Sequence, residues 1–154
     1  MKIDLRLLLG ALALSSQLFA FDAAKATQLH HFYSKMDQKA CADSKLFIKA
    51  EEVMGMIREG KPYLLLDVRT QGEASVLGLT DAHSALIPIE RLFTPEALKT
   101  LPTDRPIIAI CHSGTRGTMA AIGLKQLGFK NVHVLKGGMI ALADADTPKN
   151  APLK

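Results

Sequence analysis

One cysteine in this chain stands in a setting that favours chemistry. Cys111 follows the apolar run Ile107–Ile110, whose β-branched residues predict a buried strand. It precedes residues 118–127, whose apolar side chains recur at helical spacing. The loop of residues 111–117 should therefore join the carboxyl end of a strand to the start of a helix, and open α/β sheets bind their ligands at that edge.

The composition of this loop predicts an anion site. The first N–H groups of a helix have no partner within the helix, and the helix dipole favours a thiolate, a persulfide or an oxyanion there. Gly114 and Gly117 let the backbone curl so that its amides point inward, and Arg116 adds a planar cation. These features favour the thiolate of Cys111 and predict a nucleophile, against the alternative of a buried, inert cysteine. The candidate site consists of Cys111 as the nucleophile and His112, Ser113, Gly114, Thr115, Arg116 and Gly117 as the anion-binding loop.

Four short motifs, found in a fixed order along the chain, point to one family. Residues 111–116 read Cys-His-Ser-Gly-Thr-Arg, which fits the pattern Cys-x-x-Gly-x-Arg. Leu-Asp-Val-Arg at 66–69 and Ile-Pro at 87–88 precede it, and Val-Leu-Lys-Gly-Gly at 134–138 follows it. Through these motifs residues 45–143 resemble the rhodanese-like domain family, which implies a parallel five-stranded sheet with helices on both faces.

The resemblance also implies a sulfurtransferase. Cys111 would take sulfane sulfur from a donor such as thiosulfate or polysulfide, hold it as a persulfide and pass it to a thiophilic acceptor. A non-enzymatic sulfur carrier or sensor would use the same loop, so that alternative stays open. A Cys-based phosphatase or arsenate reductase is less favoured, because only four residues separate Cys111 from Arg116, where the related dual-specificity phosphatases have five. The smaller loop suits one sulfur atom better than a phosphoryl group.

Asp67 and Arg69 end the preceding strand at the same sheet edge. Two residues apart on a strand, they can project to the same side. The resemblance implies that they support the active-site region through hydrogen bonds, and we expect this supporting role. The alternative is a local ion pair of little energy.

Segments with strand and helix patterns alternate along the chain, which predicts an α/β domain with a parallel sheet and right-handed crossovers. The expected strands are residues 46–48, 63–68, 86–89, 107–110 and 132–135. The expected helices are residues 50–59, a helix that starts at Thr94 and Pro95, residues 118–127 with Gly128 after them, and residues 139–143.

The ends of the chain have their own patterns. Residues 1–20 resemble a secretory signal peptide, with Lys2 and Arg6 before an apolar run, so we expect a periplasmic or secreted protein. Contact with a membrane is expected only if this segment is not cleaved. Residues 21–44 should form a helical extension packed on the domain, with an apolar face that includes Leu29 and Tyr33. Residues 144–154 should be a loose tail.

The overall composition excludes several functional classes. The chain has 154 residues, a net charge of +4 and 48% hydrophobic residues, which suits one globular domain. The sequence has no cluster of Lys and Arg residues of the kind that would indicate binding to nucleic acid. The histidines and cysteines have no zinc-ligand spacing, and we expect neither a metal nor a cofactor. The expected partners are small sulfur-containing anions or thiols, with a sulfur-accepting protein as a further candidate. The second cysteine, Cys41, is expected to be a buried or spare thiol.

Overall fold

The computed structural model describes residues 21–146, which fall into two compact units that divide between Ala42 and Asp43. The predicted signal segment and most of the predicted tail lie outside the described residues. Within residues 21–146, no helix is long and apolar enough to cross a membrane.

The N-terminal extension contains two helices where the sequence pattern suggested one apolar helical face. Helix α2 spans Ala23–Tyr33 and helix α3 spans Gln38–Asp43. The break between them has a local cause, because the side chain of Asp37 accepts a hydrogen bond from Ala40 N at 2.7 Å and so starts a new helix. No residue of either helix is buried, and Cys41 in α3 is exposed. That the extension packs on the domain stays a prediction.

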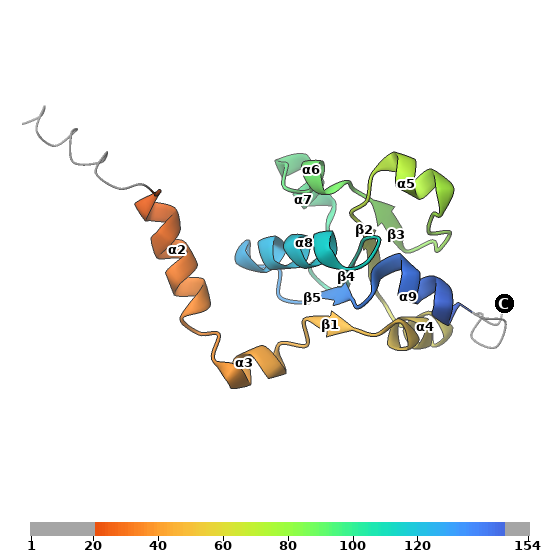
Figure 1. The fold of residues 1–154 in the computed structure, drawn as a ribbon, viewed down its shortest axis with the longest axis horizontal. Helices are drawn as coiled ribbons and strands as arrows, with labels where there is room; N and C mark the ends of the chain where they lie inside the picture. Colours follow the sequence, from red (N-terminus) through yellow and green to blue (C-terminus); the bar gives the residue numbers. More distant parts are fainter. Residues whose placement is uncertain (1–20, 147–154) are drawn as a thin grey trace, which may run out of the picture. The chain divides into compact units, whose positions relative to one another are not determined.

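The second unit is built on a parallel five-stranded sheet, as the sequence predicted (Figure 1). The strands are β1 (Phe47–Ile48), β2 (Leu64–Asp67), β3 (Ser84–Leu86), β4 (Ile107–Ile110) and β5 (Val132–Leu135). Their order across the sheet is β1-β5-β4-β2-β3, so β4 lies at the centre. All four pairings are parallel, and the connections between the strands carry helices.

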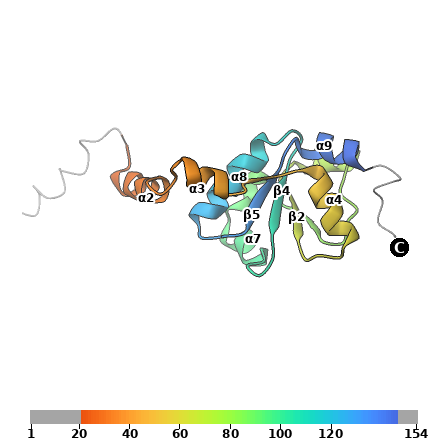
Figure 2. The same ribbon diagram turned by 90° about the horizontal axis from the view of Figure 1, so that it is seen from below.

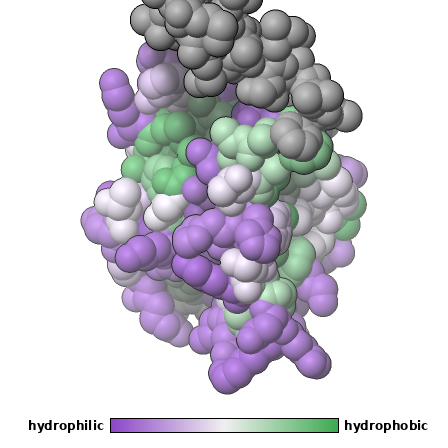
Figure 3. Space-filling model, turned by 90° about the vertical axis from the view of Figure 1, so that its left-hand side faces the viewer, coloured by the Kyte–Doolittle hydropathy of each residue, from purple (hydrophilic) through white to green (hydrophobic). Residues whose placement is uncertain are grey.

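Helices cover both faces of this sheet (Figures 1 and 2). Helices α6 (Ile89–Leu92), α7 (Pro95–Thr100) and α8 (Thr115–Gln126) lie on one face, and α4 (Ala50–Arg58) and α9 (Gly138–Ala145) lie on the other. Helix α5 (Gln71–Val76) follows β2. Successive side chains of β4 enter opposite layers: Ile107 and Ala109 face α8, whereas Ile108 and Ile110 face α4 and α9. On the face shown in Figure 3, hydrophilic side chains predominate, with smaller hydrophobic areas between them.

Several element boundaries differ from the sequence-based expectation, and β3 also starts two residues early, at Ser84. Strand β3 ends at Leu86 rather than Ile89, because the chain leaves the sheet for α6, which starts at Ile89 with Pro88 at its N-cap. Helix α8 begins at Thr115, three residues earlier than expected. Helix α9 continues to the buried Ala145, into the segment expected to be a loose tail.

The helix caps agree with the local sequence signals. Thr94 caps α7 by accepting a hydrogen bond from Ala97 N, and Pro95 follows at the first helical position. Gly128 has a φ of 97° and follows the end of α8. Its N–H donates to Lys125 O, and Phe129 N donates to Leu124 O, which is the hydrogen-bond pattern of a Schellman motif.

Candidate active site

Cys111 lies at the carboxyl end of the central strand. The alternation of side chains along β4 directs it toward α8, among the buried residues of that layer. It carries a free thiol in a residue that is only 2% exposed. The N–H of Gly114 donates a hydrogen bond to Sγ at 3.1 Å. The sulfur therefore has a backbone donor aimed at it, directly before the N-terminus of a helix.

The loop that carries this donor is shorter than expected. Gly114 is the N-cap of α8 with a φ of 114°, a left-handed conformation that side chains rarely adopt. Only residues 111–114 are therefore loop, whereas Arg116 and Gly117 belong to the first turn of α8. His112, Ser113 and Thr115 are exposed at the rim. The prediction that Gly117 curls the loop is thus wrong.

Gly117 instead lets α8 approach the sheet closely. A Cβ at this position would lie 3.1 Å from the carbonyl oxygen of Ala109 and 3.3 Å from Cγ1 of Val134. The first turn of α8 can thus rest directly on β4 and β5, which brings its unpaired N–H groups to the end of β4. This glycine acts through packing rather than through loop curvature.

Arg116 is held by a carboxylate that no sequence motif indicates. Its guanidinium makes a bidentate ion pair with Glu73 of α5, in which Nη1 donates to Oε2 at 2.7 Å and Nη2 donates to Oε1. The two side chains are 31% and 36% exposed. The Arg116 guanidinium holds the pKa of Glu73 well below its usual range, and the carboxylate raises the pKa of Arg116. Both groups therefore stay charged, and Glu73 sets the orientation of the Arg116 guanidinium.

Glu73 is itself fixed by a capping box at the start of α5. Thr70 Oγ1 accepts a hydrogen bond from Glu73 N at 3.2 Å, and Glu73 Oε2 accepts one from Thr70 N at 3.1 Å. The sequence does carry a signal for this cap, because Thr70 is followed three residues later by Glu73. The cap predicts a helix start, but nothing local predicts that the same carboxylate reaches Arg116.

Asp67 and Arg69 form a second ion pair, which is buried. Arg69 Nη2 donates to Asp67 Oδ2 at 2.6 Å, and Arg69 Nε donates to Asp67 Oδ1 at 2.9 Å. The two side chains are 3% and 4% exposed, so this local ion pair is buried rather than at the surface. Arg69 Nη2 also donates to Leu77 O at 2.7 Å, which ties the end of β2 to the segment that follows α5. The pair thus supports the element that carries Glu73.

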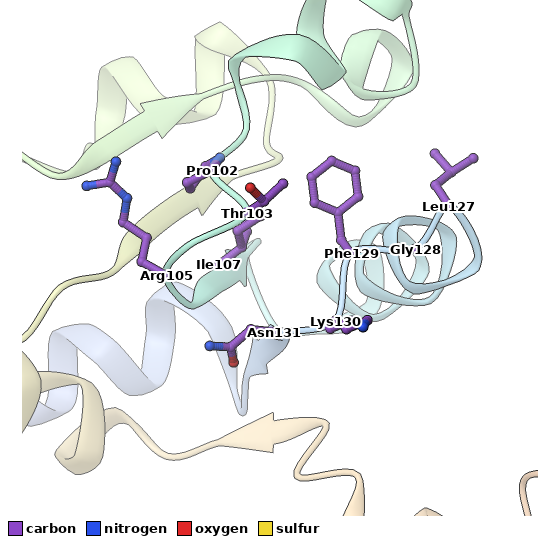
Figure 4. Close-up of a pocket in the computed structure, with 9 residues that line it drawn as sticks. All are labelled: Pro102, Thr103, Arg105, Ile107, Leu127, Gly128, Phe129, Lys130 and Asn131. Atoms are coloured by element: carbon purple, nitrogen blue, oxygen red, sulfur yellow. The ribbon is translucent and has the colours of Figure 1, made fainter.

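The cleft of about 420 Å³ in Figure 4 lies away from this chemistry. It is lined by residues 102–103, 105, 107 and 127–131, at the amino end of β4. Cys111 follows the other end of that strand, about 13 Å away at roughly 3.3 Å per residue. The cleft is therefore not part of the candidate site. At the carboxyl end of β4, a buried thiol lies beside an amide donor and a helix N-terminus, an arrangement that suits a nucleophile.

Comparisons with known proteins agree on one family. The model of the Rhodanese-like domain matches residues 49–145. A protein of Allochromatium vinosum named "Sulfurtransferase" is 31% identical over 105 residues, which cover 68% of this chain and 94% of that protein. "Probable adenylyltransferase/sulfurtransferase MoeZ" of Mycobacterium tuberculosis is 30% identical over 112 residues, which cover 73% of this chain but only 28% of that longer protein.

A solved structure supports the same relationship. The crystal structure of a rhodanese-related protein from Thermoplasma volcanium is similar to this chain with a TM-score of 0.55 and 32% sequence identity. The match covers 66% of this chain and 93% of that one. The shared part is the parallel sheet with its flanking helices.

Proposed function

The chain belongs to the rhodanese-like domain family, and from this premise we propose that it is a sulfurtransferase that carries sulfane sulfur as a persulfide on Cys111. The observation that carries the proposal is the hydrogen bond from Gly114 N to the sulfur of Cys111 at 3.1 Å, made at the N-terminus of α8. A donor at that position favours a charged sulfur, whether thiolate or persulfide. Relatives named sulfurtransferases support the same class of reaction.

The first half-reaction is a nucleophilic displacement at sulfur. The Cys111 thiolate attacks the outer sulfur of thiosulfate or polysulfide, so that an S–S bond forms at Sγ. The S–S bond of the donor breaks, and its electron pair leaves with sulfite or with the shortened polysulfide. No proton has to move when the thiol is already ionised. The unpaired N–H groups at the start of α8 stabilise the resulting persulfide anion.

The second half-reaction returns the enzyme to its starting state. A thiophilic acceptor such as cyanide, a thiolate or sulfite attacks the outer sulfur of the persulfide. The bond to Sγ breaks, and the electron pair returns to Cys111 as thiolate. Because the protein is covalently modified between the two steps, the reaction should show ping-pong kinetics.

The ion pair of Arg116 and Glu73 sets the charge around this sulfur. Arg116 orients the anionic donor, and Glu73 holds the guanidinium in one direction. Because the carboxylate compensates the cation, the site attracts small anions without holding them tightly. This suits a product such as sulfite, which must leave after the first step.

The mass of the intact protein tests the proposal. Thiosulfate or polysulfide should add about 32 mass units, one sulfur atom, and a reductant should remove them. The Cys111→Ser variant should take up no sulfur, whereas Cys41→Ser should behave as the wild type. An adduct that persists in Cys111→Ser would contradict the assignment of the nucleophile. Multiple turnovers with thiosulfate and cyanide would distinguish an enzyme from a carrier or sensor that is loaded only once.

Export and partners complete the proposal. The positively charged start of the chain and its apolar run support a location in the periplasm or outside the cell. The natural acceptor is then a small thiol or a sulfur-accepting protein of that compartment. The mature chain should begin near Phe21, which N-terminal sequencing of the exported protein would test. Intact Met1 on cytoplasmic protein would contradict it.

A further inference from the structure

Helix α9 begins directly on the active-site loop. Met139 N donates a hydrogen bond to the carbonyl oxygen of Cys111 at 2.8 Å, and Ile140 N donates to the carbonyl oxygen of His112 at 3.4 Å. The first N–H groups of a helix normally have no backbone partner. Here two of them bind the backbone of the nucleophile and of its neighbour.

Gly138 makes this contact possible. It is the first residue of α9 and has a φ of 60°. A Cβ at this position would overlap the carbonyl oxygen of Cys111 and would lie 2.6 Å from the carbonyl oxygen of His112. Both atoms belong to the backbone, so neither can rotate away as a flexible side chain would. Any other residue here must push the loop away from α9.

The contact determines which way the loop peptides face. In a planar trans peptide the N–H points opposite to the C=O. Since the carbonyl oxygens of Cys111 and His112 face α9, the N–H groups of His112 and Ser113 point away from that helix. The loop then turns at Gly114, whose N–H reaches Sγ. The carbonyl oxygens of Cys111 and His112 would repel an anion. Because they accept hydrogen bonds from α9, they point toward that helix.

We propose that Gly138 is a positioning residue for sulfur transfer: it lets α9 hold the Cys111–His112 backbone in the orientation that aims Gly114 N at the sulfur. This inference rests on the proposed function and adds a second helix to its machinery. Helix α8 supplies the unpaired N–H groups, and α9 fixes the loop from which the sulfur projects.

Two other glycines of the chain provide matched controls. Gly60 has a φ of 63°, nearly that of Gly138, but a Cβ there would meet nothing within 4 Å. Gly137 has a φ of 80°, and a Cβ there would come within 2.7 Å of Ala141 Cβ in α9 rather than near the loop. Alanine at Gly60 therefore introduces backbone strain alone, and alanine at Gly137 disturbs the same turn without touching Cys111.

The experiment compares Gly138→Ala, Gly137→Ala and Gly60→Ala. All three should be less stable than the wild type, because alanine is strained at a positive φ. Per folded molecule, Gly138→Ala should load sulfur from polysulfide about ten- to a hundredfold more slowly, the effect of misplacing a reacting group by about 1 Å. The two control variants should stay within about threefold of the wild type in this rate. Equal loading rates in all three variants would overturn the proposal.

Alkylation of Cys111 separates this inference from the proposed function. In Gly138→Ala, the pH at which iodoacetamide reacts at half its maximal rate should rise, because Sγ loses the aimed amide; in the two controls it should not change. If the wild type takes up no sulfur, the proposed function fails, while the alkylation profile still decides the role of Gly138. An unchanged profile in Gly138→Ala would overturn that role.

A measurement on the wild type keeps the proposal testable if Gly138→Ala does not fold. The N–H of Met139 should exchange with deuterium at least about tenfold more slowly than the N–H groups of Thr115 and Arg116, which open α8 without backbone partners. Equal exchange rates at these positions would show that α9 does not hold the loop, and would overturn the proposal.

Discussion

Two arginine–carboxylate pairs lie near one end of the sheet, and their surroundings differ. Asp67 and Arg69 are almost completely buried at the end of β2, and Arg69 also holds the carbonyl oxygen of Leu77. Glu73 and Arg116 join α5 to the first turn of α8, and each side chain keeps about a third of its surface exposed. The two pairs share the same chemistry and differ in burial.

We expect this difference in burial to separate a structural role from a functional one. Removing one partner of a buried pair leaves an uncompensated charge without water, which strongly destabilises the fold. A half-exposed pair contributes little to stability because water screens both charges. However, Arg116 stands five residues after Cys111 in the first turn of α8, so its orientation should matter for the anionic donor of the proposed reaction. The first pair should therefore control stability and the second should control activity.

The largest expected effect concerns the buried pair. Asp67→Asn should lower the free energy of unfolding by about 3–5 kcal/mol, because Arg69 then stays buried without its counter-charge. Urea denaturation followed by circular dichroism would measure it. Asp104→Asn is the control, because its pair with Arg105 is exposed and should contribute little. If the two variants unfold at the same urea concentration, burial does not distinguish the pairs.

The next effect should appear in catalysis rather than in stability. Glu73→Gln keeps a side chain that can complete the capping box with Thr70, but it removes the charge that fixes Arg116. We expect kcat for thiosulfate to fall about ten- to a hundredfold, with an almost unchanged thermal unfolding midpoint. Steady-state kinetics and differential scanning calorimetry on the same preparation test both parts. A variant that loses stability but keeps its kcat would reverse the roles of the two pairs.

A smaller effect is expected for Arg116→Lys. Lysine keeps the positive charge but loses the planar fork that meets Glu73 with two donors. The kcat/KM for thiosulfate should fall about tenfold, which corresponds to roughly 1.4 kcal/mol. Arg105→Lys, on the exposed pair, should leave the kinetics unchanged. Wild-type kinetics in Arg116→Lys would mean that charge alone matters at this position.

The smallest effect concerns pH. Because Arg116 lowers the pKa of Glu73, the carboxylate loses its charge only as the pH falls well below the ordinary value for glutamate, about 4.3. Between pH 8 and pH 5 the pair should stay ionised. The ratio of kcat between the wild type and Glu73→Gln should therefore change by less than about twofold over this range. A ratio that approaches one at pH 5 would show that Glu73 takes up a proton there.

Much of the fold follows from patterns within a few residues. The apolar run of β4, the Thr94-Pro95 helix start and the glycine after α8 are each local signals, and each is found at or within a residue of its predicted place. The end of β3 was placed three residues too late, because the apolar run of residues 86–89 continues from the strand into α6, which starts at Ile89. The start of α8 was set three residues too late, because the polar residues Thr115 and Arg116 conceal the first helical turn.

The sequence by itself determined the strand–loop–helix around Cys111 and the parallel α/β architecture, because strand and helix periodicity depend on neighbouring residues. Tertiary structure alone decided that Glu73 meets Arg116 across 43 positions of sequence, and that Gly138 lies against the backbone of Cys111. It also decided that the Asp67–Arg69 pair is buried. These contacts depend on the order of strands in the sheet, which brings β2, β4 and β5 side by side, and no pattern within a single segment encodes that order.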